Sequence, residues 1–433
     1  MLISHLHEVF ISCRNKISTD SRNIIPGSIF FALKGENFDG NLFARQAMEK
    51  GAAYCVVDNP DLVGIDKMIV VEDVLKTLQN LANFHRNTFS IPIIAITGSN
   101  GKTTTKELIA AVLSKKYLTH YTKGNLNNHI GVPLTILNID TTHEIAVIEM
   151  GANHQGEINK LCEIANPDFG IITNIGKAHL EGFGGIEGVK KGKSEMYKFI
   201  SKKKGKIFLH GDDDILQELS SSNDKITYGT KKLYDVVGKL NHNANAVEFA
   251  WKTRYKATEI KSAPLIKTQL VGIYNYFNIL CAACVGNYFS VPEEEINEAI
   301  SSYLPENNRS QLKKTEKNIL ICDYYNANPT SMKAAIENFK KSEFKNKFLI
   351  LGDMLELGDE TQSEHNAIVT LLNELCFDEF ILIGPEFHSI LPEKSVVNTE
   401  KAIEKLHSMH LENKTILLKG SRGMALEKLI PTL

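Results

Sequence analysis

The clearest alternation of apolar and polar segments lies near residue 100. The run IPIIAIT (91 to 97) has the length and composition of a buried strand. The polar segment GSNGKT follows it, and then apolar residues recur at helical spacing, namely Leu108, Ile109, Val112 and Leu113. This pattern predicts a strand, a glycine-containing loop and a helix in succession.

Two more apolar runs follow in the same part of the chain. EIAVIEM (144 to 150) and FGIITNI (169 to 175) each lead into polar residues and glycine. In α/β proteins, ligand-binding loops follow the carboxyl ends of strands. These runs predict a central, helix-covered parallel sheet.

A second α/β pattern begins after Pro305. Helix-like segments from Pro329, near 362 to 374 and near 400 to 409 alternate with four apolar runs, at 319 to 323, 348 to 353, 380 to 384 and 415 to 420. This alternation predicts a second parallel sheet of the Rossmann-like kind. Polar segments follow the carboxyl ends of these four strands, at 323 to 328, 352 to 358, Gly384 and 419 to 423. Open α/β sheets bind ligands at these ends.

The length of 433 residues also favours several domains, at about 150 residues each. Residues up to about 85 form a smaller mixed pattern with short strands. We therefore predict an α/β protein with three domains: a small mixed α/β domain (1–88), a central phosphate-loop domain with a parallel sheet (89–305) and a Rossmann-like domain (306–433).

Composition and charge narrow the class of protein. Hydrophobic residues make up 43% of the chain and charged residues 23%, as in ordinary globular proteins. The net charge of -2 favours neither nucleic acid nor an anionic membrane. The opening residues lack the pattern of a secretory signal, and no apolar run approaches the roughly 20 residues needed to cross a bilayer. We expect a cytoplasmic protein with small-molecule partners and no membrane insertion.

Two features have a plain interpretation that we prefer. Cys281 and Cys284 form a C-x-x-C pair in a helix-like apolar stretch, which could be redox-active but is more simply a pair of buried small residues. The lysine run 202 to 206 is interpreted as a solvated turn.

TGSNGKTTT (97 to 105) carries the strongest chemical signal. A phosphate loop needs inward backbone N–H groups, a lysine for the β and γ phosphates and a hydroxyl for Mg²⁺. Gly98, Gly101, Lys102 and Thr103 supply these at a helix start, although the usual first glycine position holds Ile96. The alternative is a chance Gly-Lys-Thr, which the preceding strand makes less attractive.

The spacing TGxxGKT resembles that of the Mur ligases and folylpolyglutamate synthases. Further segments resemble Mur ligase motifs over essentially the whole chain: GNLNNHIGVPLTIL (124 to 137), EMGANHQGEI (149 to 158), AHLEGFGG (178 to 185), GIYNYFN (272 to 278), DYYNANPTSM (323 to 332) and GDMLELGDE (352 to 360). Several are typical of the member that adds D-alanyl-D-alanine. The resemblance implies an ATP-dependent ligase that joins this dipeptide to UDP-N-acetylmuramoyl-tripeptide through an acyl phosphate, for cell-wall peptidoglycan.

The resemblance also assigns roles to residues. It implies catalytic roles for Lys102, His179, Lys193 and Arg309. It implies nucleotide contacts by Gly98, Ser99, Asn100, Gly101, Lys102, Thr103, Thr104, Asn275, Asn278, Arg309, Asp323, Tyr325, Asn326 and Asn328. It implies two Mg²⁺ ions held with the help of Thr103, Glu149, His179 and Lys193.

Lys193 can bind a metal cation only after a chemical change, because its ammonium group is itself positively charged. A lysine carbamate is an anionic oxygen ligand, and the family resemblance implies that Lys193 is carbamylated. From spacing alone, the alternative is that Lys193 is an exposed lysine in a basic stretch. Likewise, Glu149 could be a solvated strand terminus, and His179 could be an ordinary surface or core histidine.

For the precursor, the resemblance implies contacts by Ser21, Arg22, Lys34, Asn127 and Asn128. For the carboxylate of the dipeptide, we expect Lys419, Ser421 and Arg422, since a carboxylate calls for cationic or N–H donors. Asn41 stands where the family usually has histidine, so its contact with the uracil side is open. We expect a monomer.

Several other functions were weighed. The sister ligase that adds the third residue normally carries an Asp-Asn-Pro-Arg type motif, which is not seen after residue 305, and folylpolyglutamate synthases lack the first domain. A GTPase switch should show Asn-Lys-x-Asp, which is absent, and a small-molecule kinase would leave two α/β units unexplained. A binding protein without turnover would leave Glu149, His179 and Lys193 without a task.

Overall fold

The computed structural model describes residues 2–241 and 245–433. The chain divides into two compact units. The first unit comprises Met1–Ala95, Tyr117–Gly151 and Glu157–Phe169, and the second comprises Ile96–Lys116, Ala152–Gly156 and Gly170–Leu433. The boundaries of the three predicted domains stay a prediction.

The first unit is an α/β structure. Its helices and strands are α1 (Ile3–Ser12), β1 (Ile17–Ser18), β2 (Ile29–Phe31), β3 (Lys34–Gly35), β4 (Phe38–Asp39), α2 (Ala44–Glu49), β5 (Tyr54–Val57), β6 (Met68–Val70), α3 (Val74–Arg86), β7 (Ile93–Thr97, which continues into the second unit), β8 (Thr119–Tyr121), α5 (Gly131–Leu137), β9 (Ile145–Glu149) and α6 (Glu157–Ala165). Strands β1, β2, β5 and β6 form a four-stranded parallel sheet in that order. One face of this sheet packs with α2 in an apolar cluster that includes Phe30, Ala47 and Val57.

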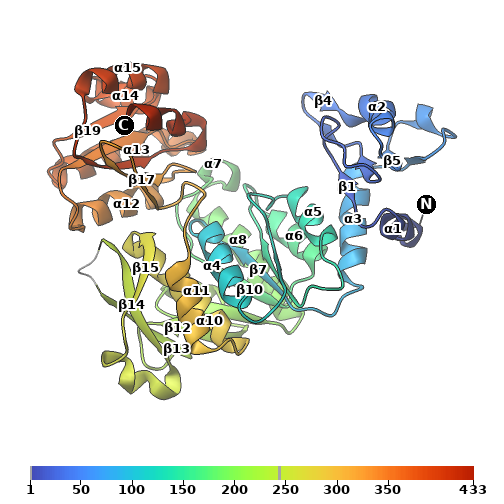
Figure 1. The fold of residues 1–433 in the computed structure, drawn as a ribbon, viewed down its shortest axis with the longest axis horizontal. Coiled ribbons are helices and arrows are strands. Elements are labelled where there is room, and N and C mark those ends of the chain that lie inside the picture. The colour runs from blue at the N-terminus through green and yellow to red at the C-terminus, as the bar shows by residue number, and fades with distance from the viewer. Residues whose placement is uncertain (1, 242–244) are drawn as a thin grey trace. The chain divides into compact units, whose positions relative to one another are not determined.

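The second unit holds the remaining elements. Those before residue 303 are α4 (Lys102–Leu113), β10 (Phe169–Ile172), α7 (Leu180–Phe183), α8 (Ile186–Lys202), β11 (Lys206–His210), α9 (Asp214–Leu219), β12 (Asp224–Gly229), β13 (Val236–Asn241), β14 (Ala246–Thr253), β15 (Ile266–Val271), α10 (Tyr276–Tyr288) and α11 (Glu293–Ser302). Helices α4, α10 and α11 pack against one another (Figure 1). Cys281 and Cys284 are buried in α10, where burial raises the pKa of Cys281 to about 12, so the plain interpretation of this pair is favoured.

The sheet formed by strands β11 to β15 differs in part from the central parallel sheet that the sequence predicts. Strands β11, β12 and β13 are parallel, but β13, β14 and β15 are antiparallel, and β11 to β15 were not predicted from the sequence. The lysine run 202 to 206 forms the turn between α8 and β11, with exposed side chains at 202 to 204, as predicted.

The part after residue 310 forms a six-stranded sheet. Its elements are β16 (Gln311–Lys314), β17 (Ile319–Asp323), α12 (Pro329–Lys341), β18 (Lys347–Gly352), α13 (Thr361–Glu374), β19 (Phe380–Ile383), α14 (Pro385–Ile390), β20 (Ser395–Val396), α15 (Thr399–Met409) and β21 (Thr415–Lys419). The strand order is β16-β17-β21-β18-β19-β20, all parallel except β16 (Figure 1). The four predicted strands and three predicted helices are confirmed, and β16 and β20 are additional edge strands.

The carboxyl ends of β17 and β21 are neighbours in this sheet, since Asp323 pairs in register with Lys419. Two sequence segments 96 residues apart therefore meet at one tip, as expected for an open parallel sheet. The predicted α/β fold class is confirmed. Among the residues described, no helix is both long enough and apolar enough to cross a membrane.

Candidate active site

The loop 98–101 connects β7 to α4 with the backbone geometry of a phosphate loop. Gly98 has φ +143° and Gly101 has φ +79°, values that favour glycine. A Cβ atom at Gly98 would lie 2.0 Å from Thr173 Oγ1, and one at Gly101 would lie 2.6 Å from Asn278 Oδ1. Both glycines are therefore required by conformation and by close neighbours, and the loop ends at the N-terminus of a twelve-residue helix that favours anions.

The loop is braced by the segment that follows β10. Asn174 accepts a hydrogen bond from Asn100 N (3.1 Å) and donates one to Asn100 O (3.0 Å), and Thr173 Oγ1 donates to the same carbonyl (2.5 Å). Ser99 Oγ donates to Gly176 O at 2.9 Å. Thr173, Asn174 and Gly176 were not predicted as supporting residues, although the polar end of FGIITNI was a signal for them.

Lys102 is the first residue of α4, and its side chain folds back over the loop. Its Nζ donates to Gly98 O at 2.8 Å and to Ser99 O at 3.1 Å. Thr103 and Thr104 are buried in the same first turn. A lysine held by carbonyl groups of its own loop can turn to a phosphate through side-chain rotation alone.

The predicted adenine-side residues lie next to the loop. Asn278 Nδ2 donates to Asn275 Oδ1 at 3.0 Å, and Asn275 Nδ2 donates to Val271 O at 2.9 Å and to Ser310 Oγ at 3.2 Å. The structure thus places Asn278 against Gly101 and links it through Asn275 to Ser310.

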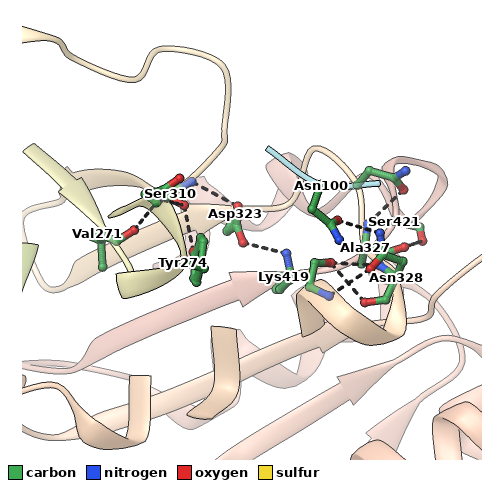
Figure 2. Close-up of polar contacts among 12 residues, drawn as sticks. Asn100, Val271, Tyr274, Ser310, Asp323, Ala327, Asn328, Lys419 and Ser421 are labelled. Atoms are coloured by element: carbon green, nitrogen blue, oxygen red, sulfur yellow. Dashed lines mark hydrogen bonds and ion pairs between the residues drawn. The ribbon is translucent and has the colours of Figure 1, made fainter. Parts of the chain in front are cut away.

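Asp323 and Lys419 form an ion pair at the tip of the C-terminal sheet (Figure 2). The Lys419 Nζ to Asp323 Oδ2 distance is 2.6 Å, and the Lys419 residue is only 2% exposed. Asp323 Oδ1 also accepts from Ser310 N at 3.1 Å. Burial, and then the charge of Asp323, raise the pKa of Tyr274, whose hydroxyl lies 2.8 Å from Ser310 Oγ.

Asn328 joins the C-terminal loop to the phosphate loop. Its Oδ1 accepts from Ser331 N at 2.9 Å, which caps α12, and Ser331 Oγ accepts from Asn328 N at 3.1 Å. Its Nδ2 donates to Asn100 Oδ1 at 2.8 Å (Figure 2). Because Oδ1 of Asn328 accepts the capping hydrogen bond, Nδ2 is the atom of this amide that faces Asn100 and donates to it.

Two arginines lie around Tyr325. Arg309 Cζ is 3.8 Å from the centre of the Tyr325 ring, Arg422 Cζ is 5.3 Å from it, and Arg422 Nη1 donates to the Tyr325 hydroxyl at 3.3 Å. Arg422 and Asn326 are exposed. Ser421, in contrast, is buried, and its Oγ accepts from Leu355 N at 2.9 Å.

His179 and Lys177 contact the segment that follows β18. His179 Nδ1 lies 2.5 Å from Glu356 Oε2, and this contact lowers the pKa of Glu356. Lys177 forms an ion pair with Glu364 and lies 3.7 Å from Glu360. With Nδ1 facing Glu356, the other ring nitrogen of His179, Nε2, is the atom that could bind a metal ion.

Lys193 lies inside the second unit, on α8. The residue is 1% exposed, its Nζ donates to Ala152 O at 3.3 Å, and it lies 5.1 Å from the centre of the Phe183 ring. The alternative of an exposed lysine in a basic stretch is wrong. The carbamylation of Lys193 stays a prediction.

The first unit holds the other predicted metal and precursor residues. Glu149, at the end of β9, is 1% exposed, and its Oε1 accepts from Asn127 Nδ2 at 2.8 Å. Asn128 Oδ1 accepts from Ile130 N and Gly131 N at the start of α5. Asn127 and Glu149 thus lie together, and Asn128 has a capping contact.

The residues predicted to hold the uridine diphosphate also lie in the first unit. Lys34 Nζ forms an ion pair with Asp58 at 2.8 Å, Arg22 is exposed, and Ser21 is half-buried. Asn41 is buried, and its amide donates to Asp39 and Asp58 at 2.7 Å each. Asn41 therefore supports the loop that carries it.

Models of Mur ligase domains match most of the chain. The Mur ligase family catalytic domain matches residues 15–90, the Mur ligase middle domain matches 96–286, and the Mur ligase glutamate ligase domain matches 308–422. Together with a relative that is 36% identical over 96% of this chain, these matches establish that the chain belongs to the Mur ligase family.

That relative is the UDP-N-acetylmuramoyl-tripeptide--D-alanyl-D-alanine ligase of Bacillus subtilis, of which 92% is covered. Among solved structures, MurF from Acinetobacter baumannii is similar, with a TM-score of 0.85, 31% identity and coverage of 96% of this chain and 92% of that chain. MurF ligase from Thermotoga maritima in complex with ADP is similar with a TM-score of 0.83, 28% identity and 96% coverage of each chain.

Proposed function

We propose that the protein is an ATP-dependent ligase that joins D-alanyl-D-alanine to UDP-N-acetylmuramoyl-tripeptide and so forms the pentapeptide precursor of peptidoglycan. The similar relatives that carry this activity in their names support the substrates. The observation that carries the mechanism is the hydrogen bond from Asn328 to Asn100, which joins a loop of the C-terminal sheet to the phosphate loop.

In the proposed reaction, ATP phosphorylates the terminal carboxylate of the tripeptide, and the amine of the dipeptide then displaces phosphate from the acyl phosphate. Phosphoryl transfer depends mainly on positioning and on stabilising charge on the transferred group. Lys102 and Arg309 supply positive charge, and the N–H groups at the start of α4 hold phosphate oxygens. Asn275 and Asn278 would contact the base.

We propose that Mg²⁺ takes part in the reaction. The residues present fit a magnesium site only if Lys193 is carbamylated. Among the residues described, no three His, Cys, Asp or Glu side chains come together as a metal site. A carbamate on the buried Lys193 would add the anionic oxygens that Mg²⁺ prefers, and Thr103 would add a hydroxyl. Glu149 and His179 complete the proposed set. Bound Mg²⁺ would neutralise phosphate charge.

The remaining assignments follow the same proposal. Residues 1–88 would bind the UDP portion through Ser21, Arg22 and Lys34, residues 89–305 the ATP, and residues 306–433 the dipeptide. Asn127 and Asn128 would contact the muramyl peptide. We propose that the protein is cytoplasmic, where its two nucleotide substrates would be available, and that it is a monomer.

The test is phosphate release from Mg-ATP in the presence of UDP-N-acetylmuramoyl-tripeptide, with D-alanyl-D-alanine or single amino acids as acceptors. We expect release with the dipeptide alone, together with a product heavier by the dipeptide less one water. Release only with a diamino acid and the dipeptide-bearing precursor would instead assign the sister activity, and no release with any acceptor would refute a ligase.

A further inference from the structure

A short linker connects α11 to β16, and we call residues 303–310 the strap. Its two ends are held by different parts of the second unit. Tyr303, at the start of the strap, and Asn307, in its middle, contact Glu107 on α4. At the end, Asn308 and Ser310 contact the C-terminal sheet. The strap therefore connects the phosphate-loop helix to the tip of that sheet.

Glu107 receives both donors of the strap at one carboxylate. The Tyr303 hydroxyl donates to Oε2 at 2.6 Å, and Asn307 Nδ2 donates to Oε1 at 3.0 Å and Oε2 at 2.9 Å. Lys106 Nζ lies 3.6 Å from Oε1. Hydrogen bonds to a charged acceptor are stronger than neutral ones, so Glu107 is a firm anchor for the strap.

The C-terminal end of the strap is also held by hydrogen bonds, which Asn308 and Ser310 form. The Tyr324 hydroxyl donates to Asn308 Oδ1 at 3.0 Å, and Tyr325 N donates to Asn308 O at 3.3 Å. Ser310 N donates to Asp323 Oδ1 at 3.1 Å (Figure 2). The residues on both sides of Arg309 are thus tied to the end of β17.

Arg309 differs from the other strap residues described above, which are held by hydrogen bonds. Its Nε is buried and has no hydrogen-bond partner among the described residues, while its guanidinium lies over the Tyr325 ring at 3.8 Å. A buried donor without a partner is costly unless a ligand completes it. The strap therefore presents a guanidinium with an unused donor, and its orientation depends on the anchors on either side.

We propose that Glu107 is a positioning residue of the ligase reaction, which holds Tyr303 and Asn307 so that Arg309 is aligned with the phosphoryl group at the loop 98–101. This inference rests on the proposed function. Glu107 lies one and a half turns along α4 from Lys102, so one helix sets the position of both cations. A displacement of about 1 Å in such a group can cost up to 10²-fold in rate.

The primary test compares Glu107→Ala with wild type in the phosphate-release assay. We expect kcat to fall about 10-fold and KM for ATP to change less than about 2-fold, because the nucleotide still binds while the arginine is misaligned. Glu298→Ala is the matched control, since Glu298 pairs at 3.0 Å with Lys115, which lies just beyond the end of α4 and outside the strap. An unchanged kcat in Glu107→Ala would overturn the proposal.

A double-mutant cycle with Arg309→Ala separates positioning from general stability. If Glu107 acts through Arg309, its removal should cost little more once Arg309 is absent, and the two losses should be strongly non-additive. Additive losses would contradict the proposal. Glu107→Gln retains one acceptor oxygen and should recover part of kcat, whereas a loss equal to that of the alanine variant would count against the anchor.

Two further controls keep the test decisive. If Glu107→Ala does not fold, Tyr303→Phe and Asn307→Ala each remove one donor and leave α4 intact, and the cycle is made with them. If wild type releases no phosphate with any acceptor, the proposed function itself fails. If wild type is active and Glu107→Ala keeps its kcat, only the proposal about Glu107 is overturned.

Discussion

The phosphate loop and the segment 419–423 both follow the carboxyl end of a parallel strand, and both place a lysine there. The lysines differ in what holds them. Lys102 donates to carbonyl oxygens three and four residues away in its own loop. Lys419 forms an ion pair with Asp323, 96 residues away, and both side chains are largely buried.

This difference separates a lysine that can bind a ligand from one that maintains the fold. A carbonyl group that loses its lysine stays neutral, so breaking the hydrogen bonds from Lys102 to its own loop leaves no unpaired charge on that loop. If Lys419 moved away, it would leave an unpaired carboxylate in a largely buried position, which is expensive. We therefore assign Lys102 to the nucleotide and Lys419 to the structure, and we leave Arg422 as the cation for the dipeptide.

The largest expected effect tests the first half of this comparison. Lys102→Ala should lower kcat by about 10³-fold, because the charge that stabilises the transferred phosphoryl group is lost. Phosphate release measures it, and Lys116→Ala, beyond the other end of the same helix, is the control. Near-normal turnover in Lys102→Ala would contradict the assignment of the loop.

Lys193 extends the comparison to a lysine whose charge is proposed to be reversed. Lys193→Ala should lose activity on the order of 10²-fold and should recover part of it when a short carboxylic acid is added, since the acid replaces the carbamate oxygens. Lys191→Ala, exposed on the same helix, should retain activity. Wild-type behaviour of the Lys193 variant would rule out the carbamate.

The second half of the comparison predicts an effect on stability. Lys419→Ala should lower the free energy of unfolding by about 3 kcal/mol, because Asp323 is left as an uncompensated, largely buried charge. Urea unfolding measures this change. The double variant Lys419→Met with Asp323→Asn should be less destabilised. A stable Lys419→Ala protein with a raised KM for the dipeptide would reverse our assignment.

Arg422 is expected to show the smallest effect. Arg422→Ala should raise KM for D-alanyl-D-alanine about 10-fold, which corresponds to about 1.4 kcal/mol, and should leave the midpoint of thermal unfolding unchanged. Lys428→Ala, another exposed cation that pairs with Glu400, serves as the control. Equal KM values for both variants would remove Arg422 from the dipeptide site.

The sequence predicted well those features that depend on local pattern. The strand, loop and helix from 91 to 113 and the four strands after Pro305 are confirmed, because each is a continuous apolar run or a helical repeat bounded by turn residues. Strands β11 to β15 were missed, and four of them, β12 to β15, mix buried and partly exposed positions without long apolar runs. The edge strand β16 is mostly exposed, so it has no apolar pattern at all.

In the candidate site, the sequence predicted which residues carry chemistry better than it predicted what each one contacts. Lys419 was expected at a carboxylate, and it does contact one, but the carboxylate belongs to Asp323 of the same chain. The pairing of Glu107 with Asn307 spans 200 residues, and no local pattern records it. Such partners are set by tertiary packing, which is why they emerge only from the structure.

The amide of Asn328 caps α12 with its oxygen and reaches the phosphate loop with its nitrogen. A helix of 13 residues is about 20 Å long, so the far end of α12, at Lys341, lies about 20 Å from the contact with Asn100. A rotation of α12 about this contact would move that far end the most. A pair of spectroscopic labels, one near Lys341 and one on α4, would therefore measure such a rotation as a change in distance.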